Sequence, residues 1–199
     1  MIEETLKKRK QVRIFNTRKA PGIELVKRII TKAFEVSASK QNFYPFNVFI
    51  LHKEEDRKIF WEITKSAPGG DGNYNAETGP YHLIFTRRTV TTHPDPKIKE
   101  RIAKGLVYPI MDKDSDEDHR VAVEVGMFAK VLTTMALEHN IDVAYQLCFP
   151  DFDGQPEKWS KLPFVKENVL LCMQLGYDSN KKDNDREIKP QIDEVVKWI

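Results

Sequence analysis

Positively charged side chains gather near the start of the chain, in residues 9–13 (RKQVR). An Arg guanidinium is a planar fork of N–H donors that matches phosphate oxygens, and a Lys ammonium adds a point charge. In an extended segment alternate residues project on the same side, so Arg9, Gln11 and Arg13 would share one side. With Lys10 between them, this pattern predicts a clamp for a phosphate group. The alternative is a set of cations that stabilise the end of a preceding helix through its dipole.

A second polar cluster lies in residues 37–46 (SASKQNFYPF). Ser39 and Asn42 can both donate and accept hydrogen bonds, and the aromatic residues beside them could flank a flat ring system. The cluster falls between an expected helix and an expected strand, where binding loops are common. A capped helix end would use the same residues, so both alternatives stay open. A third segment, 186–190 (REIKP), would contribute only if a distant anion needs further cations.

The hydrophobic spacing predicts the elements that hold these clusters. Helices are expected over 2–10, 23–37, 54–66, 98–106, 120–139 and 192–198, and strands over 47–52, 81–86, 143–149 and 168–175. This order lacks strict strand–helix alternation, which favours an α+β fold with a modest sheet around a central helix. The helix over 120–139 is apolar on most sides and is expected to be buried. The glycine-rich residues 68–80 are the candidate for a mobile lid.

The composition of the 199-residue chain argues against several classes of protein. Its length predicts one domain over 1–199, and its net charge of +2 is too balanced to favour nucleic-acid binding. Neither Cys148 nor Cys172 lies in a CxxC pair, and the histidines show no HxxxH spacing, so neither a disulfide framework nor a metal site is expected. The N-terminus has no apolar signal segment, and no apolar run approaches the roughly 18 residues of a membrane span. We therefore expect a cytoplasmic protein that binds no nucleic acid and no membrane.

Several segments together resemble the nitroreductase-like family of FMN-dependent flavoproteins. Residues 9–15 (RKQVRIF) are similar to the family's Arg-Arg/His-Ser-x-Arg/Lys-x-Phe motif. Residues 37–51 are similar to its Pro-Ser-x-x-Asn-x-Gln-Pro-Trp loop and the strand that follows it. The positions that match this loop at unchanged spacing are Ser39, Asn42, Pro45 and Phe46. Near the C-terminus, residues 169–177 resemble the family's last strand, and residues 189–196 resemble its Arg-Pro-x-Glu-Glu-Val-Val tail.

The chain also departs from the family pattern at several positions. Ala38, Tyr44 and Phe46 replace the Pro, Gln and Trp of the loop, and Gln11 replaces a usual Ser. Residues 147–148 (Leu-Cys) stand where the family often has Glu-Gly, and the usual Gln-Asn of the central helix is absent. These differences keep two alternatives open: a non-catalytic flavin-binding protein, and a flavin-consuming or dehalogenating enzyme of the same fold.

The resemblance implies a nitroreductase-like homodimer, in which a mixed, mainly antiparallel sheet packs around the central helix and the C-terminal segments are exchanged. It implies FMN at the dimer interface, with a hydride from NAD(P)H passing through flavin N5 to a small electron-poor acceptor, nitroaromatic or quinone-like. The flavin does the redox chemistry and the protein orients it, so no catalytic triad is expected.

The cofactor-binding residues that the resemblance implies are Arg9, Lys10, Gln11, Arg13, Ser39, Asn42, Leu147, Cys148, Arg186 and Lys189. Ser39 and Asn42 would reach the flavin from the other subunit. The backbone amides of Leu147 and Cys148 would lie near N5.

Overall fold

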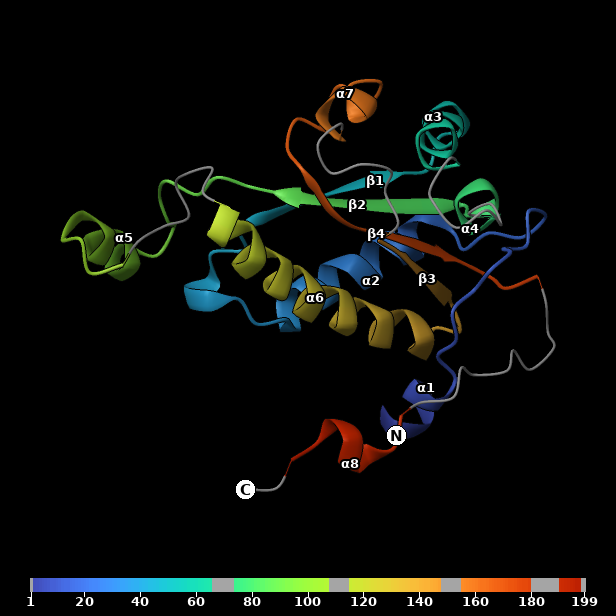
Figure 1. The fold of residues 1–199 in the computed structure, drawn as a ribbon, viewed down its shortest axis with the longest axis horizontal. Coiled ribbons are helices and arrows are strands. Elements are labelled where there is room, and N and C mark those ends of the chain that lie inside the picture. The colour runs from blue at the N-terminus through green and yellow to red at the C-terminus, as the bar shows by residue number, and fades with distance from the viewer. Residues whose placement is uncertain (1, 66–73, 108–114, 148–154, 180–189, 198–199) are drawn as a thin grey trace.

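The computed structural model describes residues 2–65, 74–107, 115–147, 155–179 and 190–197 (Figure 1). A four-stranded sheet forms its centre, and helices lie on both faces. The fold is α+β, as the sequence predicts. All three strand pairings are antiparallel, so the expected mixed sheet is antiparallel throughout the described residues.

The strands are β1 (Phe46–Leu51), β2 (Tyr81–Arg87), β3 (Asp142–Gln146) and β4 (Val169–Gly176). They lie in the order β1-β2-β4-β3, so β1 and β3 are the edges of the sheet. An edge strand carries a row of backbone groups with no partner strand in the sheet. The inner strand β2 is buried along its whole length. This explains why its sequence lacks the alternation of polar and apolar residues that a half-exposed strand shows.

Helices α2 (Ile23–Val36) and α6 (Ser115–Glu138) pack against one face of the sheet and form the larger hydrophobic core. Val26, Ile29 and Ala33 are the buried residues of α2. Their spacing of three and four residues keeps them on one side of the helix. This helix therefore fixes the start of the loop that carries the second polar cluster.

Helices α3 (Glu54–Thr64), α4 (Tyr74–Thr78) and α7 (Gln155–Trp159) cover the opposite face of the sheet. Phe60 and Trp159 are buried there, with their ring centroids 6.0 Å apart. Both α4 and α7 lie where the sequence predicts no regular element, because five-residue helices carry too little periodicity to be recognised.

The remaining helices are short: α1 (Ile2–Lys7), the 3-10 helix η1 (Lys40–Asn42), α5 (Pro96–Ala103) and α8 (Ile192–Val195). Helix α1 ends three residues earlier than the sequence predicts, so residues 8–16 follow it as an irregular segment. Among the helices that the structure describes, none is both long and apolar enough to cross a membrane.

The central helix α6 is less buried than its composition predicts. Val123 is 64% exposed and Met127 is 48% exposed, and a spacing of four residues places them on one side of the helix. A helix that packs on a sheet through one side needs a second neighbour to cover its other side. In the described chain nothing covers this side, so the prediction of a buried helix is wrong for it.

Candidate functional site

The irregular segment 8–16, which carries the basic motif, is tied to the chain that leaves β4. Asn16 N–H donates to the Tyr177 carbonyl at 2.7 Å, and Ser179 N–H donates to the Ile14 carbonyl at 3.0 Å. An isolated antiparallel bridge also joins Phe15 to Asp178. The basic motif is therefore not a continuation of α1, because its backbone pairs with a distant part of the chain.

Buried apolar side chains anchor the same segment on the sheet. Val12 and Phe15 are buried in a small cluster with Ala144 of β3. Gly176, the last residue of β4, allows this close approach, since a Cβ atom there would lie 2.7 Å from Phe15 Cδ1 and 2.7 Å from Pro80 Cδ. The position of Phe15 therefore requires a glycine at residue 176. Because Val12 and Phe15 are both buried, the segment is fixed on the sheet on both sides of Arg13.

Gln11 and Arg9 both contact Tyr145 on the edge strand β3. Gln11 Nε2 donates to the Tyr145 carbonyl at 2.8 Å, and Tyr145 N–H donates to Gln11 Oε1 at 3.2 Å. The side-chain amide of Gln11 therefore makes the two hydrogen bonds that the backbone of a neighbouring strand would make with Tyr145. The Arg9 guanidinium lies over the Tyr145 ring, 5.3 Å from its centroid, within the range of a cation–π contact. The edge of β3 thus orients both side chains.

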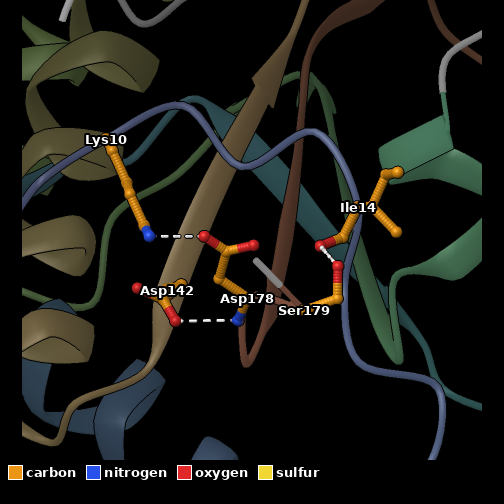
Figure 2. A network of polar contacts seen from close by, with 5 residues as sticks. All are labelled: Lys10, Ile14, Asp142, Asp178 and Ser179. Atoms are coloured by element: carbon orange, nitrogen blue, oxygen red, sulfur yellow. Dashed lines mark hydrogen bonds and ion pairs between the residues drawn. The ribbon is translucent and has the colours of Figure 1, made fainter. Parts of the chain in front are cut away.

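Lys10 pairs with Asp178, which follows β4 and is itself hydrogen-bonded to Asp142 at the start of β3 (Figure 2). Its ammonium pairs with the carboxylate of Asp178, and Asp178 N–H donates to Asp142 Oδ2 at 2.9 Å. Burial raises the pKa of the Asp142 carboxyl, which the hydrogen bond from Asp178 and the charge of Lys10 partly oppose. Ser179 Oγ closes the network by donating to the Ile14 carbonyl at 2.9 Å. The charge of Lys10 is therefore already partly balanced within the chain.

The loop that carries the second polar cluster has an unusual backbone. Gln41, Asn42 and Tyr44 have φ values of 54°, 57° and 45°, in the left-handed region. Asn adopts this region readily, whereas a Gln or Tyr there is strained. Such strain concentrates at functional sites and persists only where surrounding contacts enforce it.

Three residues outside the loop supply these contacts. Arg88 donates to the carbonyls of Phe43 and Tyr44, at 2.7 and 3.1 Å. His93 Nε2 lies 3.3 Å from the Asn42 carbonyl. Glu124 of α6 accepts hydrogen bonds from the other end of the loop. Sequence reasoning missed all three, because only the fold brings them to the loop.

The loop over residues 39–44 and Tyr145, the residue on which Arg9 of the basic segment (residues 8–16) stacks, bond to opposite sides of α6. Ser39 bonds to Glu124, whereas the Tyr145 hydroxyl bonds to the Thr133 hydroxyl and donates to the Ala129 carbonyl. Nine residues separate Glu124 from Thr133, which is two and a half turns of helix and therefore a half-rotation about its axis. One chain thus places α6 between the two predicted parts of the site.

Some predicted residues lie outside the described part of the chain. These are Cys148, Arg186 and Lys189, together with residues 68–73 of the candidate lid. Leu147, the first residue after β3, is described and is 64% exposed. The roles predicted for these residues stay predictions.

A cavity of about 610 Å³ opens between α2, β1 and the segment that follows β2. Ile30 and Phe34 of α2, and Phe46 and Val48 of β1, give it an apolar lining, with Arg88 at one side. The cavity lies beside the free edge of the sheet. It therefore combines an apolar surface with backbone groups that a further strand could pair with.

Reactive thiol or metal chemistry finds no support in the described residues. Burial raises the pKa of the Cys172 thiol well above its ordinary value, which disfavours the reactive thiolate. Within the described ranges no three His, Cys, Asp or Glu residues group together in a way that could hold a metal ion.

Solved structures share this fold over the full chain. A proposed NAD(P)H:FMN oxidoreductase from Staphylococcus epidermidis superposes with a TM-score of 0.76 at 18% identity, covering 100% of this chain and 96% of the other. A proposed nitroreductase from Exiguobacterium sibiricum, solved in complex with FMN, gives 0.73 at 15% identity, covering 100% and 97%. A nitroreductase family protein from Streptococcus pneumoniae gives 0.74 at 17% identity, covering 100% of both chains.

No curated protein matches this sequence. The model of the nitroreductase family matches residues 6–177, which include the basic segment, the 39–44 loop and all four strands. The chain therefore belongs to the nitroreductase family.

Proposed function

We propose that this protein is an FMN-dependent oxidoreductase that takes a hydride from NAD(P)H and reduces a small electron-poor acceptor, nitroaromatic or quinone-like. Membership of the nitroreductase family supports a flavin-dependent oxidoreductase in general. The observation that carries the finer proposal is the fixing of residues 8–16 on β3 and the end of β4. Backbone hydrogen bonds at Ile14 and Asn16 and the burial of Val12 and Phe15 hold the Arg9–Arg13 motif in place.

The described residues fit a phosphate-bearing cofactor. A phosphate with nearly two negative charges needs more than one cation, and Arg9 and Arg13 flank a short, anchored stretch of chain. Gln11 and Lys10 are held by Tyr145 and Asp178, and their contacts keep the segment in shape. In the proposed site Arg186 and Lys189 add further positive charge from the C-terminal segment.

When bound, FMN would supply the redox chemistry, accepting a hydride at flavin N5 and passing electrons to the acceptor. The chain's own residues bind and orient it. Arg9 and Arg13 would hold the phosphate, and the backbone amides of Leu147 and Cys148 would lie near the ring.

We further propose that the active form is a homodimer. Within one chain α6 lies between the basic segment and the 39–44 loop, so Ser39 and Asn42 would serve the flavin of the partner. The exposed apolar side of α6, with Val123 and Met127, suits burial against a second copy.

The C-terminal segment supports the same assembly. Ile192 and Val195 of α8 are 73% and 67% exposed. The apolar cavity beside the free edge of β1 offers the complementary surface. We therefore propose that the tail of each subunit crosses to the β1 edge of the other.

The test is the purified protein with FMN. Flavin absorbance that is bleached by NADH or NADPH, and restored by a nitroaromatic or a quinone, supports the oxidoreductase. Bound flavin that neither nucleotide bleaches favours the non-catalytic alternative, and loss of the flavin itself under turnover favours a flavin-consuming enzyme. Protein that binds no FMN would overturn the proposal. Light scattering of the same sample measures whether the mass is that of two chains.

A further inference from the structure

A row of amide side chains is buried between the sheet and the helices α3, α4 and α7. Asn75 of α4, Gln174 of β4 and Gln146 of β3 are 7%, 0% and 4% exposed. Buried amides are costly unless their donors and acceptors are paired. The hydrogen-bond partners of each amide therefore show which polar atom is left to bind a ligand.

Each hydrogen bond in the row runs in the same direction. Asn75 Nδ2 donates to Gln174 Oε1 at 3.3 Å, and Gln174 Nε2 donates to Gln146 Oε1 at 3.1 Å. The carbonyl of Gln146 is thus occupied, and its NH₂ group is left at the end of the row. Gln146 Nε2 is buried and has no hydrogen-bond partner among the residues that the structure describes. The row ends on a donor that lacks an acceptor.

This donor lies beside the candidate cofactor site. Gln146 is the last residue of β3, between Tyr145, which pairs with Gln11, and Leu147, which is exposed. Its side chain projects to the same face of β3 as Ala144, because alternate residues of a strand share a face. Ala144 is the residue on which Val12 and Phe15 of the basic segment pack. The donor and the basic segment therefore share one face of β3.

We propose that Gln146 binds the flavin, its side-chain NH₂ donating a hydrogen bond to an acceptor atom of the ring system, and that Gln174 is the positioning residue that turns the amide this way. This inference rests on the proposed function. An amide is suited to the task because the bond from Gln174 holds its oxygen away from the ring. The flavin ring offers carbonyl oxygens and unprotonated nitrogens as acceptors, so the pairing satisfies both sides.

The test uses full-length protein titrated with FMN at pH 8, with the flavin absorption spectrum recorded in each case. Gln146→Glu keeps an oxygen that accepts from Gln174 and replaces the NH₂ group by an oxygen. We expect its FMN dissociation constant to rise about tenfold and the absorption bands of the bound flavin to shift. Gln146→Met, which is similar in length and removes both polar atoms, should give the same two changes if the glutamate variant fails to fold.

The matched control is Asn75→Ala, which removes the far end of the row and leaves both the bond from Gln174 to Gln146 and the NH₂ of Gln146 intact. Its FMN affinity should fall less than threefold, and its flavin spectrum should stay that of the unaltered protein. Gln174→Glu removes the donor that turns the Gln146 amide, so it should weaken FMN binding and shift the spectrum as Gln146→Glu does. Equal losses in Gln146→Glu and Asn75→Ala would overturn the inference, because they would show a general packing effect. Unaltered protein that binds FMN, together with a Gln146→Glu variant that binds it equally well, would overturn this inference alone. Unaltered protein that binds no FMN would overturn the proposed function as well.

Discussion

Ser39, in the loop that follows α2, donates a hydrogen bond from its hydroxyl to the carboxylate of Glu124 on α6. The same carboxylate accepts from Lys40 N–H at 3.3 Å, and Ser39 Oγ accepts from Tyr44 N–H at 2.8 Å. This bond between Ser39 and Tyr44 spans Gln41 and Asn42, and all of Gln41, Asn42 and Tyr44 have positive φ. Glu124 is therefore the residue through which α6 fixes the backbone of the candidate flavin-binding loop.

Replacement of that carboxylate should loosen the loop. In Glu124→Ala the hydroxyl of Ser39 and the N–H of Lys40 lose their acceptor, and we expect the free energy of unfolding to fall by about 1–2 kcal/mol. FMN affinity should fall about three- to tenfold, because the loop would have to be ordered on binding. Chemical denaturation and FMN titration measure the two effects. Glu138→Ala, at the exposed end of the same helix, is the control, and an equal effect of both changes would contradict the role given to Glu124.

The positive φ of Gln41 leads to a second prediction. Glycine adopts this backbone conformation without strain, whereas alanine retains a strain of roughly 1–2 kcal/mol. We expect Gln41→Gly to be more stable than Gln41→Ala by about 1 kcal/mol in thermal or chemical denaturation. At an ordinary helix position alanine is more stable than glycine. A Gln41→Ala variant at least as stable as Gln41→Gly would therefore show that the backbone is not strained at Gln41.

Arg13 should contribute to FMN binding through its charge. A charge-assisted hydrogen bond contributes about 1.5–3 kcal/mol, so Arg13→Gln should weaken FMN binding roughly ten- to a hundredfold. The loss should shrink as salt is added, because ions screen an exposed charge. Lys8→Gln removes one positive charge from an exposed residue just before the motif and serves as the control. An Arg13 variant that binds FMN as tightly as the Lys8 variant would remove Arg13 from the phosphate site.

The elements that the sequence predicts well are those with a long local pattern. The helix expected over 23–37 is observed as Ile23–Val36, and the strand expected over 81–86 as Tyr81–Arg87. Their burial depends on residues a few positions apart, and that spacing is visible in the sequence. The exposed side of α6 is different. Val123 and Met127 resemble core residues in the sequence, because the apolar pattern of the helix does not show which of its sides the rest of the chain covers.

The candidate site is less predictable, because it depends on contacts between distant residues. The motif over 9–13 is recognisable locally, but the sequence gives no sign that Lys10 meets Asp178 or that Gln11 pairs with Tyr145. Glu124 likewise reaches the 39–44 loop only through the packing of α6. Local pattern thus identifies segments that can bind a cofactor, and the fold determines which side chains hold those segments in place.

His82 should make stability depend on pH. Burial, and secondly the charge of Arg57, lowers the pKa of His82 from 6.5 to about 3. Between these values the unfolded chain binds a proton that the folded chain does not, so stability falls as the pH drops below about 6.5. At pH 5 the loss from this one group is about 2 kcal/mol relative to pH 8. Denaturation midpoints of the unaltered protein and of His82→Leu, measured from pH 8 to pH 5, isolate the effect. His52→Gln, a change at an exposed histidine, should keep the full pH dependence, and a leucine variant that keeps it too would contradict the prediction.

The exposed side of α6 should be the surface on which two chains meet. Met127 is half-exposed at the middle of this side, four residues from Val123. In Met127→Asp a carboxylate would have to be buried at the interface without a partner, which costs several kcal/mol. We therefore expect light scattering to show a single chain for this variant where the unaltered protein shows two. FMN affinity should fall together with the dimer, because Ser39 and Asn42 of the second chain are then lost from the site. Lys58→Asp makes a comparable change at an exposed residue of α3, on the opposite face of the sheet from α6, and it should leave a dimer that retains FMN. A monomeric Met127→Asp variant with undiminished FMN affinity would show instead that the flavin site is complete within one chain.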